Sequence, residues 1–415
     1  MPQLITLKTN CISVLLLLLL SLNNYSIAQT MSTIAGNGQA GYSDEPQAIT
    51  SQLYSPTGVA VSGSIIYVAD GRNNRIRKFM PGGSMTTIAG NDYTGSRGDD
   101  GPATDAQLNG PTSVATDRWG NLYIADKYNN RVRKITPQGI IYAFAGDGQQ
   151  GYSGDGSKAI TAQLNIPAGM VADTSGNVYI ADAGNNCIRK VTPDGLISTI
   201  AGTGIAGYKG DSGSAIKAQL NTPVALALDS IGNLYIADSW NYRIRRVTPS
   251  GFITTIAGAG LAGYEGDGGE DTSALLNLPT GLAFGKGGDL YIADQANNRI
   301  RRITTKGIIT TMAGNGNAGY SGDGGNALSG EMNAPYSIAT DATGNIYVAE
   351  QMNNVLRKIT PPPPPQPIVK KTDKKPAEAA KPLSPIVPYK PMPTSTPVNR
   401  GFQYSPGSVP ARRKG

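Results

Sequence analysis

The chain has 415 residues and a formal net charge of +7, with 53 glycines, 39% hydrophobic and 16% charged residues. This composition is too apolar for a disordered chain, and the glycines lack the three-residue period of collagen. The sequence contains no histidine, which excludes a catalytic His dyad or triad, a His-ligated zinc ion and a histidine pH switch within this chain.

Residues 1–28 have the pattern of a secretory signal peptide. A single charge, Lys8, precedes an apolar stretch from Cys11 to Leu22, and the segment ends on small residues at Ala28. The apolar stretch is about 12 residues long, shorter than the roughly 20 that a membrane-spanning helix needs. We expect cleavage after Ala28, with an uncleaved anchor as the alternative. The mature protein would be secreted, periplasmic or held at the cell surface.

One unit recurs six times after this leader. Its Tyr-Val-Ala-Asp phrase at 67–70 returns every 56 residues, and the last copy ends in Glu350. A period of this length indicates a propeller or a solenoid. Each unit holds four strand-like runs, separated by the Asn, Asp and Gly residues that tight hairpin turns require. Six units of four antiparallel strands predict an all-β, six-bladed β-propeller over residues 29–360.

The two ends of the repeat region complement each other. The sixth unit stops after its third strand-like run, Val355 to Ile359, and the mature chain begins with an extra run, Ser32 to Ala35, that is similar to the fourth run of other units. The N-terminal strand is therefore predicted to complete the last blade and close the ring, leaving no open sheet edge. The first run of each unit, such as Val59 to Val61, should be the innermost strand.

The composition changes sharply after Thr360. Residues 361–415 hold 15 of the 28 prolines and ten Lys or Arg against two acids, which predicts a disordered, basic tail with polyproline II character. The tail carries +8 and the leader +1 of the net +7, so the body is left near −2. The basic charge therefore belongs to the tail, and the body gives no support to nucleic-acid binding.

Two repeated phrases, Gly-Asn-Leu-Tyr-Ile-Ala-Asp at 120–126 and Asn-Asn-Arg-Val-Arg-Lys at 129–134, resemble NHL repeats. The Gly-rich stretch at 318–325 and the Leu-Asn-x-Pro at 164–167 are similar to bacterial extracellular and teneurin-type NHL propellers. The resemblance covers residues 31–360. It implies a six-bladed propeller and usually a binding or scaffolding role, although some propellers of similar shape are enzymes, such as gluconolactonase-type lactonases.

The repeats provide an internal control, because a residue present in every blade serves the blade. Repeated residues such as Asp126 and Arg133 should satisfy turn amides or each other. The turn after the second strand and the long Gly-rich loop after the fourth should share one face. Loops of about twenty residues on a rigid frame are commonly functional, so this face is predicted to bind the partner.

The turn after the repeated Asp differs from blade to blade and carries residue types that dominate binding hot spots. The candidates for a ligand- or partner-binding patch are Arg72, Lys127, Tyr128, Trp240, Tyr242, Gln351 and Met352. The alternative is scattered surface variation. We expect a monomeric, non-catalytic propeller whose partner is a protein or a glycan.

The Gly-rich loops also carry one aspartate each, a residue type that can ligate Ca²⁺. These residues are Asp99, Asp155, Asp211, Asp267 and Asp323. Calcium loops usually offer several acids in close spacing, so we expect no cofactor and expect each Asp to cap the short turn that follows it. The alternative function is an exported gluconolactonase-like hydrolase or lyase with a divalent metal at the channel mouth. The predicted innermost strands carry no acid, base or amide, so no catalytic residue is assigned.

Overall fold

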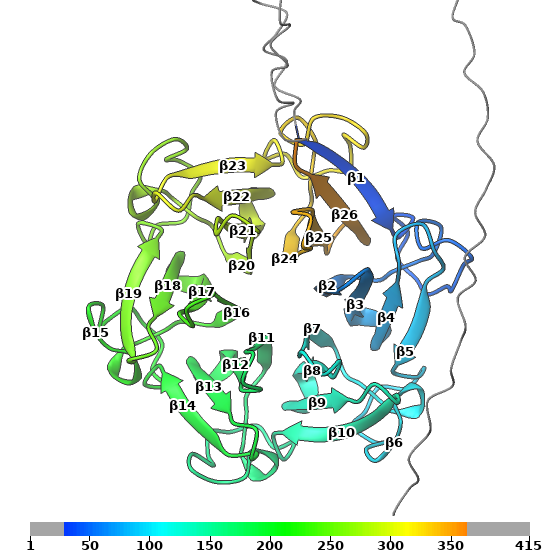
Figure 1. Ribbon diagram of the computed structural model, residues 1–415, viewed down its shortest axis with the longest axis vertical. Helices are drawn as coiled ribbons and strands as arrows, with labels where there is room; N and C mark the ends of the chain where they lie inside the picture. The colour runs from blue at the N-terminus through cyan, green and yellow to red at the C-terminus, as the bar shows by residue number, and fades with distance from the viewer. Residues whose placement is uncertain (1–28, 363–415) are drawn as a thin grey trace, which may run out of the picture. The chain divides into compact units, whose positions relative to one another are not determined.

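The computed structural model describes residues 29–362. The predicted signal peptide at 1–28 and the predicted tail from 363 on lie outside the described residues. Six antiparallel sheets are arranged around a central axis as the blades of a ring (Figure 1), which confirms the predicted six-bladed propeller. Within residues 29–362, no helix has both the length and the apolar character needed to cross a membrane.

Each blade has four main strands that follow one another outward from the axis. The innermost strands are β2 (Pro56–Ser62), β7 (Pro111–Thr116), β11 (Pro167–Ala172), β16 (Pro223–Leu228), β20 (Pro279–Phe284) and β24 (Pro335–Thr340). The second strands are β3 (Ile65–Asp70), β8 (Leu122–Asp126), β12 (Val178–Asp182), β17 (Leu234–Asp238), β21 (Leu290–Asp294) and β25 (Ile346–Glu350).

The outer half of each blade repeats in the same way. The third strands are β4 (Arg75–Phe79), β9 (Arg131–Ile135), β13 (Cys187–Val191), β18 (Arg243–Val247), β22 (Arg299–Ile303) and β26 (Val355–Thr360). The fourth strands are β5 (Thr86–Ala89), β10 (Ile140–Ala145), β14 (Ile197–Ala201), β19 (Phe252–Ala257) and β23 (Ile309–Ala313), and β1 (Thr30–Ala35) takes this place in the last blade.

The ring is closed by the N-terminal strand, as the sequence predicts. β1 pairs antiparallel with β26 from Thr30 opposite Thr360 to Ala35 opposite Leu356, so the two ends of the repeat region lie side by side (Figure 1). The side chain of Met31 is fully buried in the core between the fifth and sixth blades. The first residues of the propeller therefore supply the fourth strand of the sixth blade.

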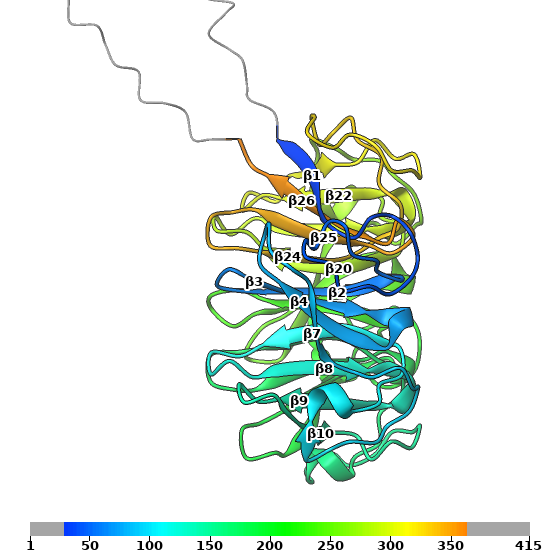
Figure 2. The ribbon, with the colours of Figure 1, turned by 90° about the vertical axis from the view of Figure 1, so that its right-hand side faces the viewer.

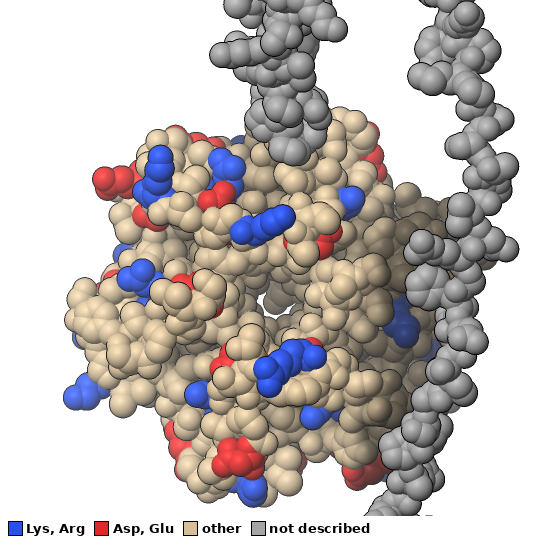
Figure 3. Space-filling view, viewed as in Figure 1, with Lys and Arg blue, Asp and Glu red and all other residues tan. Residues whose placement is uncertain are grey.

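The two faces of the ring differ in the length of their connections. Long loops gather on one side and tight hairpins on the other (Figure 2). The turn after β8 and the preceding long loop meet on the same face, because Asn129 Nδ2 donates to the Gly95 carbonyl at 2.6 Å. We call this side the loop face. Figure 3 views the hairpin face, where Lys and Arg side chains lie beside a central opening.

The turns after the second strands of the first five blades form single 3₁₀ turns. These are η1 (Gly71–Asn73), η3 (Lys127–Asn129), η5 (Ala183–Asn185), η7 (Ser239–Asn241) and η9 (Gln295–Asn297). The long loops hold further short elements, namely β6 (Gly101–Pro102), η2 (Ala103–Asp105), η4 (Ala159–Thr161), β15 (Gly213–Ser214), η6 (Ala215–Lys217) and η8 (Asp271–Ser273).

Two blades carry a fifth short strand that the sequence did not predict. β6 pairs with the outer strand β10, and β15 pairs with the outer strand β19. The Gly-rich loops run along these outer edges, where they satisfy backbone groups that would otherwise stay unpaired.

The hydrophobic core lies between the blades rather than within one of them. One cluster joins Ala69 and Ile76 of the first blade with Val114, Leu122 and Ile124 of the second. Similar clusters form around the ring. Each blade thus buries its faces against its two neighbours, so an open ring would leave the two blades at the gap with one face uncovered.

Candidate functional site

Repeated residues form a buried ionic network in every blade. Arg245 on β18 is fully buried; its guanidinium lies 3.1 Å from Asp238 at the end of β17 and 2.6 Å from Asp211 of the preceding long loop. The equivalent arginines are Arg77, Arg133, Arg189, Arg301 and Arg357. The predicted pairing of the repeated Asp and Arg is confirmed. The network joins strand, turn and loop, and so holds the loop face in place.

The loop aspartates do not cap the turns that follow them, so this expectation was wrong. Lys158, not Asp155, precedes η4, and no side chain caps that turn. Asp155 instead accepts a hydrogen bond from Arg189 at 3.0 Å. The same pairing is made by Asp99, Asp211, Asp267 and Asp323. A buried guanidinium needs several acceptors, and the loop carboxylate is one of them. The expectation that these loops bind no calcium stays a prediction.

Glu350, which replaces the repeated Asp in the sixth blade, belongs to the same network. Its Oε1 lies 3.7 Å from Arg357, and its Oε2 accepts a hydrogen bond from Asn353. Burial raises the pKa of Glu350 to about 7, against the opposing effect of Arg357. Burial likewise raises the pKa of Asp126 to about 6. The odd carboxylate therefore serves the blade and does not line the channel mouth.

The variable turn residues separate into two groups by their place in the turn. The first residue of each turn faces the channel: a Cβ on Gly71 would meet Thr57 Oγ1 at 2.9 Å, and Gln295 donates to Gln351 across neighbouring blades at 3.4 Å. The second residue is exposed on the loop face, with an exposed fraction of 59% for Tyr128 and 57% for Trp240, and two of these residues, Arg72 and Tyr128, also border the channel mouth.

A cavity of about 220 Å³ opens at the channel mouth on the loop face. It is lined by Ser55, Thr57, Gly71, Arg72, Gly110, Pro111, Thr112, Lys127, Tyr128, Tyr336 and Gln351, and we call it the mouth cavity. Four of the seven predicted residues meet here. Trp240, Tyr242 and Met352 do not line it. Gly71 occupies the channel-facing position between Gln351 and Lys127, and a Cβ there would come within 3.0 Å of Thr57 and Ser55 of the lining.

The two cations of the mouth cavity are held by aromatic rings. Arg72 donates to the hydroxyl of Tyr54 at 3.0 Å, and its guanidinium carbon lies 5.2 Å from the centre of that ring. The Lys127 ammonium lies 5.0 Å from the centre of the Tyr128 ring. Among residues 29–362, neither cation has a carboxylate within 4.0 Å. Both charges are therefore available to a ligand.

Tyr336 is the residue of this cavity that sequence reasoning missed. It follows the proline that begins β24, where the other innermost strands have Thr57, Thr112, Ala168, Val224 and Thr280. Burial, together with the nearby Tyr128, raises the pKa of Tyr336 to about 12, so the hydroxyl keeps its proton. Its departure from the repeat is visible in the sequence, but it lies in an innermost strand and not in the variable turn after the second strand.

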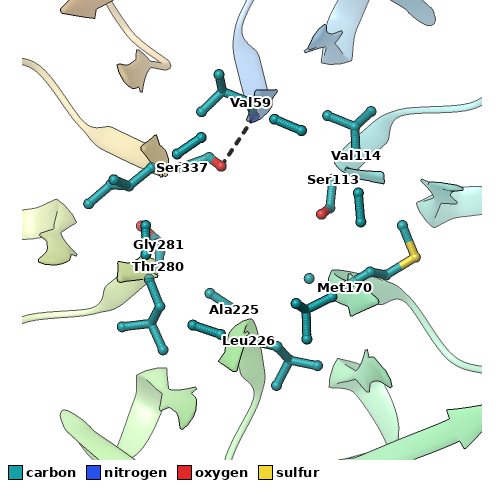
Figure 4. Close-up of a pocket in the computed structure, with 18 of the residues that line it drawn as sticks. Val59, Ser113, Val114, Met170, Ala225, Leu226, Thr280, Gly281 and Ser337 are labelled. Carbon is teal, nitrogen blue, oxygen red and sulfur yellow. Dashed lines mark hydrogen bonds between the residues drawn. The ribbon is translucent and has the colours of Figure 1, made fainter. Parts of the chain in front are cut away.

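The mouth cavity continues into the central channel. The channel has a volume of about 320 Å³ and is lined by small and apolar side chains of the innermost strands (Figure 4). The hydroxyl of Ser337 accepts a hydrogen bond from the Val59 N–H at 3.2 Å. No residue that lines the channel or the mouth cavity carries a carboxylate. This donor set does not suit the divalent metal that a gluconolactonase-like site would need.

Tyr242 departs from the repeat at a strained backbone position. In the other blades an Asn ends the turn with left-handed backbone, and its side chain accepts a hydrogen bond from the next blade, as Asn186 does from Thr222 N–H at 2.9 Å. Tyr242 has the same left-handed conformation, with φ of 53°, but no amide oxygen to accept the N–H of Leu278. Asn tolerates this conformation better than Tyr.

The substitution Tyr242→Asn is therefore expected to raise the free energy of unfolding by about 1 kcal/mol, because it restores an inter-blade hydrogen bond and relieves backbone strain. Urea unfolding of the full chain measures this. The matched control is Asn186→Tyr, which should lower stability by a similar amount. A Tyr242→Asn protein less stable than the parent would show that the tyrosine packs better than the repeat residue.

Known families match three stretches of this ring. The NHL repeat family matches residues 53–79 and 276–303, and the Teneurin NHL domain family matches residues 143–207. These stretches cover the β2–β4, β20–β22 and β11–β14 strands of a ring whose other blades repeat the same pattern. The chain is an NHL-repeat propeller. The resemblance noted in the sequence is thus confirmed.

Curated relatives of this NHL propeller include large proteins. Mouse Teneurin-3 is 30% identical over 377 residues, a match that covers 80% of this chain and 13% of the teneurin. Bovine NHL repeat-containing protein 2 is 30% identical over 286 residues, which covers 60% of this chain and 39% of that protein. The NHL propeller thus spans about 13% of the length of the teneurins it matches.

Solved structures share its fold at lower identity. A structural genomics protein of unknown function from Bacteroides thetaiotaomicron has a TM-score of 0.61 at 18% identity, over 80% of this chain and 76% of the other. An auxiliary nutrient binding protein from the same organism has a TM-score of 0.59 at 16% identity, with the same coverage of both chains. At this identity the likeness concerns the fold of the NHL propeller alone.

Proposed function

We propose that this chain is an exported, non-catalytic NHL propeller that binds a protein or a glycan through its loop face. The observation that carries the proposal is the contrast between repeated residues of the strands beside these turns and variable residues within the turns. Repeated residues such as Asp126 and Arg133 are buried in the ionic network. Variable residues such as Lys127 and Tyr128 line a cavity at the channel mouth.

The export part of the proposal rests on the signal-peptide pattern of residues 1–28 and stands apart from the binding part. The enzymatic alternative gains no support from the mouth cavity. Its lining offers two cations, two phenols, three aliphatic hydroxyls and an amide, without a carboxylate for a metal or for general acid–base chemistry. A rigid frame with an open, variable mouth is a common arrangement for ligand recognition.

The test uses two aromatic residues of one blade that lie on opposite faces. Tyr128 stands on the loop face, and Trp119, with an exposed fraction of 50%, lies in the hairpin turn that joins β7 and β8. The full chain, the Tyr128→Ala/Trp240→Ala variant and the Trp119→Ala variant would be screened against one glycan array and one panel of secreted and envelope proteins.

We expect a ligand that binds the parent chain and the Trp119→Ala variant equally but does not bind the Tyr128→Ala/Trp240→Ala variant, which we call the loop-face variant. All three proteins should have the same melting temperature. Ligands bound equally well by the loop-face variant would contradict the proposal. So would turnover of a bound ligand, because the chain would then be an enzyme.

A further inference from the structure

The mouth cavity has an unbalanced positive charge in a body that is otherwise close to neutral. Every third-strand arginine of the network faces carboxylates from two segments, as Arg189 faces Asp155 and Asp182. Arg72 and Lys127 have no such partner within residues 29–362, and none of the residues lining the cavity is acidic. A ligand that enters here meets two cations that the fold does not neutralise, which favours an anionic group.

The cavity walls hold these cations in place before a ligand arrives. Tyr54 fixes the guanidinium of Arg72 through its hydroxyl and its ring. Tyr128 lies against the backbone of Gly110, because a Cβ there would come within 2.5 Å of the Tyr128 ring. Ala334 occupies the equivalent left-handed position in the sixth blade, so the backbone itself accepts a side chain. The absence of a side chain at Gly110 therefore lets the Tyr128 ring take its position in the cavity wall.

The size and the other lining groups narrow the class of ligand. About 220 Å³ is below the roughly 300–1,000 Å³ of pockets for drug-sized ligands, so the cavity takes one ring and not a chain segment. Two tyrosine rings offer apolar faces, while the hydroxyl of Tyr336 and the side-chain amide of Gln351 offer polar contacts. Aromatic faces combined with hydroxyl and amide groups match a polyhydroxylated ring, whose flat faces are apolar and whose edges hydrogen-bond.

We infer that the mouth cavity binds a uronic acid residue of an acidic glycan, with its carboxylate between Arg72 and Lys127 and its ring beside Tyr128 and Tyr336. This inference rests on the proposed function and selects the glycan from its two partner classes. An acidic peptide would share the carboxylate, but a glutamate side chain has no ring to contact the two tyrosines.

Isothermal titration of the full chain provides the test, with three probes: trigalacturonate, its methyl ester and a Glu-rich peptide of equal charge. Trigalacturonate should bind, and its affinity should fall as salt is raised. The methyl ester and the peptide should bind at least about tenfold more weakly. Arg72→Gln and Lys127→Gln should each lower the affinity for trigalacturonate about tenfold or more, since each removes one charged contact to the carboxylate.

Two further variants separate the site from general charge effects. Lys286→Gln removes the same charge from the exposed hairpin that joins β20 and β21, and should leave affinity unchanged. Gly110→Ala keeps every cavity side chain but displaces Tyr128, and should weaken binding while the protein still folds. Absence of trigalacturonate binding, an equal effect of Lys286→Gln, or a preference for the peptide would each overturn the inference. If the uronic acid inference fails in one of these ways but another partner still binds the loop face, the proposed function stands.

Discussion

Deletion of residues 29–36 is expected to lower the free energy of unfolding by several kcal/mol, the range of large mutational effects. The deletion removes β1, exposes the edge of β26 and uncovers the core that surrounds Met31. It also disconnects the two ends of the ring. Urea unfolding of the deleted and parent chains measures the loss. A smaller slope of the unfolding free energy against urea concentration would indicate that the ring of the deleted chain is already open before it unfolds.

Two controls distinguish the strand from the closure it provides. Removal of an equal number of residues at the other end, 408–415, should leave the transition unchanged. A permuted chain in which residues 29–36 follow Thr360 through a short turn restores β1 as an ordinary fourth strand, and should recover part of the lost stability. An unchanged melting temperature in the 29–36 deletion would contradict closure by this strand.

The substitution Arg245→Met is expected to cost about 3–5 kcal/mol, because removing one partner leaves buried charge without compensation. Asp238 is fully buried and lies 3.1 Å from Arg245, and Asp211 loses the same partner. Burial raises the pKa of Asp238 even with the arginine present. Thermal melting of the variant measures the effect.

A neighbouring substitution controls for the change of residue type. Arg246→Met alters the next position of the same strand, where the side chain is half-buried, and should cost about 1 kcal/mol or less. Adding Asp238→Asn to Arg245→Met should recover part of the loss, since it removes the orphaned charge. Equal stability of Arg245→Met and the parent would show that the ionic network does not hold the blades.

The fold could be predicted from the sequence because the repeat samples the same structure six times. Strand order, ring closure and the pairing of Asp126 with Arg133 all follow from residues that recur at one spacing. The role of the loop aspartates did not follow. Asp155 pairs with Arg189, which is 34 residues away in the sequence, whereas the turn that directly follows Asp155 suggested a local capping role.

The site could be predicted only in part, because a residue that departs from the repeat does not reveal in the sequence whether its side chain faces the channel mouth or the solvent. Arg72, Lys127, Tyr128 and Gln351 meet at the mouth cavity, whereas Trp240 and Met352 stand out from the loop face. The lining also includes Gly71, whose lack of a side chain gives no sign of a binding role in the sequence. Tyr336 departs from the repeat within an innermost strand, away from the turns whose variation predicted the other residues.

The central claim is that repeated residues hold the ring together while the departures at the mouth are free to bind. Thermal melting of Lys127→Ala/Tyr128→Gly tests it most directly, because this variant gives the second blade the Ala183-Gly184 turn of the third, which has the same 3₁₀ conformation. We predict a melting temperature equal to that of the parent chain. A loss as large as that of Arg245→Met would show that these residues serve the fold, and would contradict the account.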